Sequence, residues 1–126
     1  MRFRFSPWMM SVIQGIYYIA IGLWPLVSMN TFLSVAGPKT DLWLLRTISL
    51  LISVIGLSLL VSARAGRLNA SVLALALGSA AVLGWADAYY SLTGIIWPIY
   101  LLDGVAEAVL IVGWCVAYFL SRRSLS

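Results

Sequence analysis

Apolar residues gather in four long runs along the chain, and most polar residues lie between these runs. The runs cover residues 8–29, 42–63, 68–90 and 95–120. Each run is long enough for a helix to cross a hydrocarbon core about 30 Å thick. None alternates apolar with polar residues, as the strands of a membrane barrel do. The pattern therefore predicts four membrane-spanning helices, since a backbone in lipid must satisfy its own hydrogen bonds.

The composition agrees with a membrane location. Of the 126 residues 63% are hydrophobic and only 10% are charged, and the mean hydropathy is +1.02. Soluble domains are about 45–50% apolar. We therefore predict an all-α integral membrane protein, with residues 1–126 forming a single transmembrane domain. The net charge of +4 is a matter of membrane topology here and does not indicate binding to nucleic acid.

Short connections and the placement of charge predict how the spans are oriented. Only residues 30–41, which contain Gly37-Pro38, make a loop of any size, so an up-down-up-down bundle is expected. With four spans, three groups of arginines fall on one side of the membrane, and the other side has Lys39 and Asp41. The positive-inside rule then places both termini in the cytoplasm. The three groups are Arg2 with Arg4, Arg64 with Arg67, and Arg122 with Arg123.

Four charged residues lie inside the predicted spans: Arg46, Asp87, Asp103 and Glu107. Each costs about 3 kcal/mol at the centre of a membrane helix. Counting 1.5 Å per residue from the predicted span ends places all four in the outer half of the membrane. We expect Arg46 to pair with Asp103 or Asp87. Glu107, the deepest acid, is expected to be protonated or nearly so at neutral pH, because burial and neighbouring negative charge disfavour its ionised form.

Helical spacing gathers these groups with aromatic side chains on inward faces. At 100° per residue, Asp103 and Glu107 share one face of the fourth span. The sequence thus predicts a polar, aromatic-walled pocket that opens to the outer side. Asp103 and Glu107 are the candidates for acid–base chemistry or for stabilising a cation. The candidate ligand-binding residues are Arg46, Asp87, Trp24, Trp85, Tyr100, Trp114 and Tyr17.

The simpler interpretation of the buried charges is structural. One arginine and two acids form a clasp that fixes the register of a bundle without any chemistry. A third carboxylate and the aromatic residues exceed what a clasp needs, and this surplus favours a ligand site. The third span is rich in alanine, glycine and serine, which let helices approach closely in lipid. This composition leaves open a homo-oligomer formed through that span.

Missing residue types exclude several kinds of site. The chain has no histidine, which excludes a His-ligated metal, bis-His haem and a His-based catalytic triad. Its one cysteine, Cys115, allows neither an intrachain disulfide nor a CxxC redox centre. No metal or cofactor is expected.

Two segments resemble known small membrane proteins. These are "FLSVAGPKTDLWLLRT" (residues 32–47) and "IYLLDGVAEAVLIVGW" (residues 99–114). They resemble a group of small four-span bacterial proteins, which implies a bacterial inner-membrane location and no particular activity. More distantly, the architecture is similar to DoxX-like proteins and to EXPERA-type sterol-isomerase and sigma-2-like bundles. The EXPERA-type bundles set acids and tryptophans in a membrane cavity to bind amines or stabilise carbocations. This second link rests on architecture alone.

Three functions fit these features. The first is binding of a hydrophobic or cationic small molecule or lipid by the carboxylates and aromatic walls, with catalysis left open. The second is a small proton-coupled exporter. The position of the acids on the fourth span and the single orientation count against it. The third is a structural or accessory subunit of a membrane complex, docked through the third span. The sequence does not decide between an enzyme and a binding protein.

Overall fold

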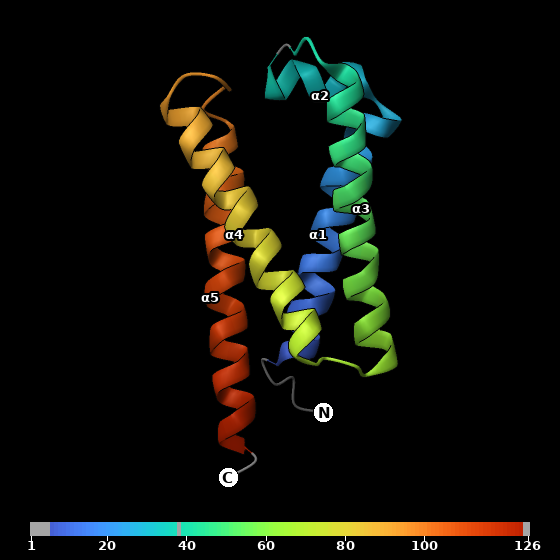
Figure 1. Cartoon of the computed structure of the whole chain (residues 1–126), viewed down its shortest axis with the longest axis vertical. Coiled ribbons are helices and arrows are strands. Elements are labelled where there is room, and N and C mark those ends of the chain that lie inside the picture. Colours follow the sequence, from blue (N-terminus) through green and yellow to red (C-terminus); the bar gives the residue numbers. More distant parts are fainter. Residues whose placement is uncertain (1–5, 38, 125–126) are drawn as a thin grey trace.

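The computed structural model describes residues 6–37 and 39–124, apart from the side chains of residues 121–124. The described part consists of α1 (Pro7–Val27), α2 (Met29–Ala36), α3 (Leu42–Ala65), α4 (Ala70–Leu92) and α5 (Tyr100–Ser124), with no strand (Figure 1). The helices α1, α3, α4 and residues 100–120 of α5 are long and apolar enough to cross a membrane. The prediction of an all-α membrane protein with four spanning helices is confirmed.

The orientation of the bundle in a membrane stays a prediction. In Figure 1, α1 begins and α5 ends at the same end of the bundle, which we call the terminal end; the other end is the linker end. Arg64 and Arg67, at the close of α3, also lie at the terminal end. Arg2, Arg4 and Pro38 lie outside the described residues, as do the side chains of Arg122 and Arg123.

The predicted loop at residues 30–41 is wrong in part, because α2 occupies its first half. The chain leaves α1 at Ser28 and turns into this short helix, which ends at Gly37 with a φ of 96°. Such a positive φ suits glycine. An aromatic contact explains why the segment is ordered: the ring of buried Phe32 packs edge-on against Trp24, with the centroids 5.3 Å apart.

The last helix begins five residues later than its apolar run. Gly94, with a φ of 81°, follows the end of α4, and Pro98 has no N–H to donate to a helix. The backbone N–H of Leu101 instead donates to the carbonyl of Pro98 at 2.9 Å and leads into α5. Apolar composition alone therefore placed the start of this span too early.

Glycines bring α1 and α3 into close contact. A Cβ added to Gly15 would lie 2.8 Å from the carbonyl oxygen of Gly56, and one added to Gly56 would lie 2.7 Å from that of Gly15. Gly22 faces Ser49 and Ser53 in the same way. Residue numbers rise along one helix as they fall along the other, so the two helices are antiparallel. Close backbone packing of this kind drives helix association in lipid.

A second antiparallel pair consists of α4 and α5. Gly84 of α4 faces Glu107, and Gly104 of α5 faces Asp87. The two pairs meet mainly through α1, which contacts α5, whereas α3 touches α4 only slightly. Figure 1 shows α4 moving away from α3 toward the linker end, where it lies beside α5. Tyr17 and Tyr18 of α1 therefore face α5.

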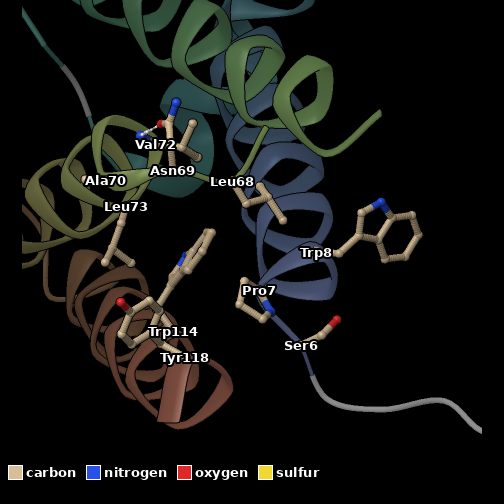
Figure 2. Close-up of a pocket in the computed structure, with 10 residues that line it drawn as sticks. All are labelled: Ser6, Pro7, Trp8, Leu68, Asn69, Ala70, Val72, Leu73, Trp114 and Tyr118. Carbon is tan, nitrogen blue, oxygen red and sulfur yellow. Dashed lines mark hydrogen bonds between the residues drawn. The ribbon is translucent and has the colours of Figure 1, made fainter. Parts of the chain in front are cut away.

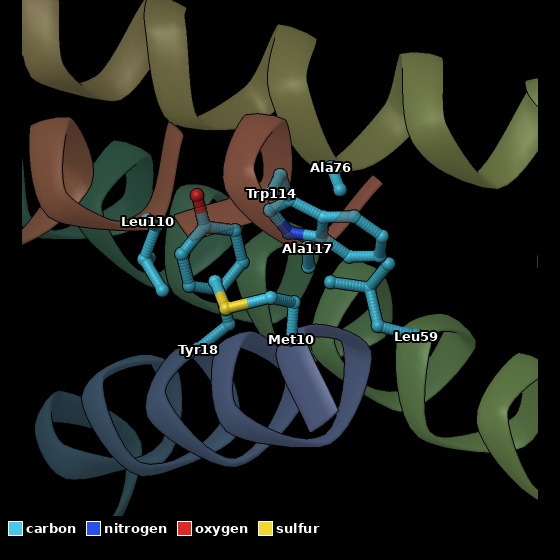
Figure 3. Packing of buried hydrophobic residues seen from close by; sticks show 7 residues of the cluster. All are labelled: Met10, Tyr18, Leu59, Ala76, Leu110, Trp114 and Ala117. Atoms are coloured by element: carbon cyan, nitrogen blue, oxygen red, sulfur yellow. The ribbon is translucent and has the colours of Figure 1, made fainter. Parts of the chain in front are cut away.

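A small core forms where the four long helices meet (Figure 3). It contains Trp114, Leu110 and Ala117 of α5 with Met10, Tyr18, Leu59 and Ala76 of the other helices. Most large apolar residues point outward instead, as a lipid-facing surface requires. On α4, Ala76 and Ala80 are fully buried, whereas Gly78 has open space beside it. Whether a second copy covers that open face stays a prediction.

Candidate functional site

Three carboxyl side chains and two tyrosines lie together between the helix pairs. We call this group the carboxyl–tyrosine cluster: Asp87 of α4, Asp103 and Glu107 of α5, and Tyr17 and Tyr18 of α1. Asp103 and Glu107 are four residues apart and face the same side of α5, one turn apart. The sequence prediction that Asp87, Asp103 and Glu107 face the interior as a group is consistent with this placement.

Tyrosine hydroxyls are the hydrogen-bond partners of the two acids on α5. The Oη of Tyr18 donates to Oε2 of Glu107 at 2.7 Å, and both side chains are only 1% exposed. The Oη of Tyr17 donates to Oδ1 of Asp103, which is half-buried. Two neighbouring residues of α1 thus reach two successive turns of α5.

Asp87 is the member of the cluster that lacks a full set of partners. It is 7% exposed, and its Oδ2 has no hydrogen-bond partner among the described residues. It packs against α5 where that helix has no side chain, since a Cβ added to Gly104 would lie 3.5 Å from the Cβ of Asp87. A buried oxygen without a donor is costly, so this atom marks a place where a proton or a ligand is expected.

The predicted pairing of Arg46 with an acid is wrong. Arg46 is exposed, and no ion pair involving it is found among the described residues. The reason is tertiary: α3 packs against α1, whereas Asp87 and Asp103 belong to α4 and α5, which make little contact with α3. The similar depth of Asp87, Asp103 and Glu107 along their helices agrees with their grouping in the structure. Depth alone did not indicate that α3, which carries Arg46, packs against a different helix.

The chain's lysine lies beside the start of α5, close to this region. The Nζ of Lys39 is 4.8 Å from the ring centroid of Tyr100, which precedes Asp103 by one turn of α5. Burial lowers the pKa of Lys39. Gly37, two residues before Lys39, packs against the ring of Trp97. The two linkers therefore touch each other at the linker end, next to the cluster.

The three candidate tryptophans do not form a common wall. Trp114 is 1% exposed and lies in the core, two turns of α5 beyond Glu107. Trp85 is 61% exposed and stacks on Tyr89, with the ring centroids 5.1 Å apart. The Nε1 of Trp24 donates to Thr31 at 3.0 Å. Tyr17 and Tyr100 are thus the aromatic candidates that the fold brings near the acids.

Tyr18 and Gln14 were not among the candidate site residues, although helical spacing places both on one face of α1 with Tyr17. Gln14 is fully buried, its Oε1 accepts from Nε1 of Trp114 at 2.6 Å, and its Nε2 donates to the carbonyl of Ala76 at 3.0 Å. It therefore ties α1 to both α4 and α5. Ser11, Gln14 and Tyr18 follow helical steps of three and four, and this polar stripe was the signal that could have identified them.

The acids of the carboxyl–tyrosine cluster form no metal-binding group, and they do not line the pocket at the terminal end. The described residues contain no group of His, Cys, Asp and Glu side chains suited to a metal ion. A pocket of about 470 Å³ lies at the terminal end, and none of its lining residues is acidic (Figure 2). A pocket around the carboxyl–tyrosine cluster stays a prediction.

Comparisons with known proteins identify no relative of this chain. No protein-family model matches it, and it matches no curated protein and no solved structure. The case for a function therefore rests on the residues of the site.

Proposed function

We propose that this integral membrane protein uses its carboxyl–tyrosine cluster to bind the cationic group of a lipophilic small molecule or lipid. The observation that carries the proposal is Asp87, a buried carboxyl with an unpartnered Oδ2. It stands beside Asp103 and Glu107, which bond to neutral hydroxyls and not to cations. We also place the protein in a bacterial inner membrane with both termini in the cytoplasm, on the basis of its resemblance and its arginines.

Charge balance supports a cationic ligand. An acid at the centre of a membrane helix costs about 2.5–3.5 kcal/mol on insertion scales. Among the described residues neither Arg46 nor Lys39 forms an ion pair with these acids. A bound cation would stabilise the ionised form of a buried acid that otherwise takes up a proton. Tyr17 and Tyr100 add aromatic faces beside the acids, and such faces attract cations.

Any chemical step at this site would use the same groups. Asp103 and Glu107 each have a tyrosine hydroxyl at hydrogen-bonding distance, so each has a partner for donating or accepting a proton. Catalysis is not required for binding.

The alternative is that the cluster only holds the two helix pairs together. The hydrogen bonds of Tyr17 and Tyr18 favour this interpretation, because they join α1 to α5. Asp87 distinguishes the two functions. Its unpartnered oxygen forms no hydrogen bond that would hold the helix pairs together, so a purely structural role does not explain it.

Binding of a lipophilic cation tests the proposal. Calorimetric titration of the full chain in detergent with tetraphenylphosphonium should show binding, and triphenylphosphine oxide, a neutral analogue, should bind far more weakly. Asp87→Asn keeps the shape of the side chain and should weaken binding of the cation at least tenfold. Asp41→Asn is the matched control, because Asp41 is an exposed acid in the α2–α3 linker. Unchanged binding by Asp87→Asn, or equal binding of the neutral analogue, would overturn the proposal.

A further inference from the structure

The pocket at the terminal end lies between the start of α1, the start of α4 with the linker before it, and α5. Pro7 at the start of α1, Leu68 before α4, Leu73 of α4 and Trp114 of α5 line it. In Figure 2, Trp114 and Leu73 face the space from one side, with Pro7 and Leu68 opposite. Its volume of about 470 Å³ lies within the range of about 300–1,000 Å³ of ligand pockets. It is therefore large enough for a ligand.

The lining of the pocket is mainly apolar, and three of its polar groups already make hydrogen bonds within the protein. Ser6 Oγ accepts from the backbone N–H of Met9 at 3.4 Å and caps α1. Asn69 Oδ1 accepts from the N–H of Val72 at 3.1 Å and caps α4. Trp114 Nε1 donates to Gln14, and its ring is almost fully buried, so Trp114 only bounds the pocket on its inner side. An apolar occupant such as an acyl chain fits this surface.

Among the described residues around the pocket, the charged side chains are positive. Arg67 immediately precedes Leu68 of the lining, and Arg64 lies in the last turn of α3; both are exposed. The four acids of the chain lie elsewhere: one before α3, one near the end of α4 and two in the first two turns of α5. Basic sites beside membrane helices attract acidic lipid head groups.

The exposed Trp8 indicates the level of this end in the membrane. It is 51% exposed and points outward from α1, away from the other lining residues (Figure 2). Tryptophans in such positions lie at the boundary between lipid head groups and acyl chains. The mouth of the pocket is then at the height where a phospholipid has its glycerol backbone.

We propose that this pocket binds an anionic phospholipid, with one acyl chain against Leu68 and Leu73 and the phosphate beside Arg67. The occupant is opposite in charge to the ligand proposed for the carboxyl–tyrosine cluster, and the two sites lie in different halves of the bundle. Charge complementarity at the terminal end selects the acidic lipid over a neutral one.

Native mass spectrometry of the full chain in detergent tests this lipid site. Palmitoyl-oleoyl phosphatidylglycerol should bind at least tenfold more tightly than phosphatidylcholine with the same chains. Ala70→Phe places a ring in the pocket and should weaken binding of phosphatidylglycerol tenfold. Ala74→Phe is its control, because Ala74 is also exposed, lies one turn further along α4 and does not line the pocket.

A second pair of variants tests the charge independently of the cavity. Arg67→Gln should weaken phosphatidylglycerol binding about tenfold and leave phosphatidylcholine binding unchanged. Arg46→Gln removes an exposed arginine at the linker end and should change neither. Equal binding of the two lipids, or equal effects of Ala70→Phe and Ala74→Phe, overturns the proposal. The proposal is also overturned if the protein is a dimer that Ala70→Phe dissociates, because the pocket then holds a second copy of the chain.

Discussion

Removing the hydroxyl of Tyr18 is the most direct perturbation of the carboxyl–tyrosine cluster. Tyr18→Phe keeps the ring, which is 1% exposed and belongs to the core, so it creates almost no cavity. It deletes the donor that lies 2.7 Å from Oε2 of Glu107, a side chain that is also 1% exposed. The buried carboxyl oxygen is left without that donor.

The size of the effect follows from this loss. A buried acceptor that loses its donor costs about 1–3 kcal/mol in soluble proteins. Side-chain hydrogen bonds in a membrane average about 0.6 kcal/mol and reach about 1.7. Because both partners are buried, we expect Tyr18→Phe to lower the free energy of unfolding by about 1–2 kcal/mol.

The assay is unfolding in mixed micelles as the mole fraction of dodecyl sulfate rises, followed by circular dichroism. Tyr89→Phe is the control, since Tyr89 is 50% exposed, and its effect should stay within about 0.5 kcal/mol. A double-mutant cycle with Glu107→Met isolates the pair and should give an interaction energy of about 1–2 kcal/mol. An interaction energy near zero would refute the hydrogen bond from Tyr18 to Glu107.

Two further predictions concern helix packing and Lys39. Gly56→Leu should lower the free energy of unfolding by at least about 2 kcal/mol, because its Cβ would meet the carbonyl of Gly15 at 2.7 Å. Gly78→Leu should not lower the free energy of unfolding, because position 78 has open space beside it and leucine has a better helix propensity than glycine. Equal losses of stability for the two variants in the dodecyl sulfate assay would contradict this. Lys39, the chain's one lysine, should titrate by NMR below its ordinary pKa of 10.5. Between its folded and unfolded pKa values stability should then rise with pH, because the unfolded state binds more protons. Tyr100→Leu should lower the pKa of Lys39 further, because it removes the aromatic ring that favours the charged ammonium. A Lys39 pKa of 10.5 or more in the unmodified protein would refute the prediction.

The sequence by itself determined the class of the protein and the faces of its helices. Four apolar runs are enough to specify four spanning helices, because lipid leaves the backbone no other partners. Helical periodicity placed Asp103 and Glu107 on one face of α5, because spacing along a helix is a local property. The apolar pattern did not determine the helix boundaries near Gly94 or in the α1–α3 connection. Turn geometry sets the first and the Phe32–Trp24 contact sets the second.

Only the tertiary structure decided which faces meet. Every inward face of a four-helix bundle has two or more candidate neighbours, and depth in the membrane does not choose among them. The glycines of α1 and α3 bring those helices together, which leaves Tyr17 and Tyr18 to face α5 and leaves Arg46 exposed. The acids therefore meet hydroxyls in place of a guanidinium. Close packing of the α1 and α3 backbones, which depends on both helices, thus determines which side chains become the hydrogen-bond partners of the acids.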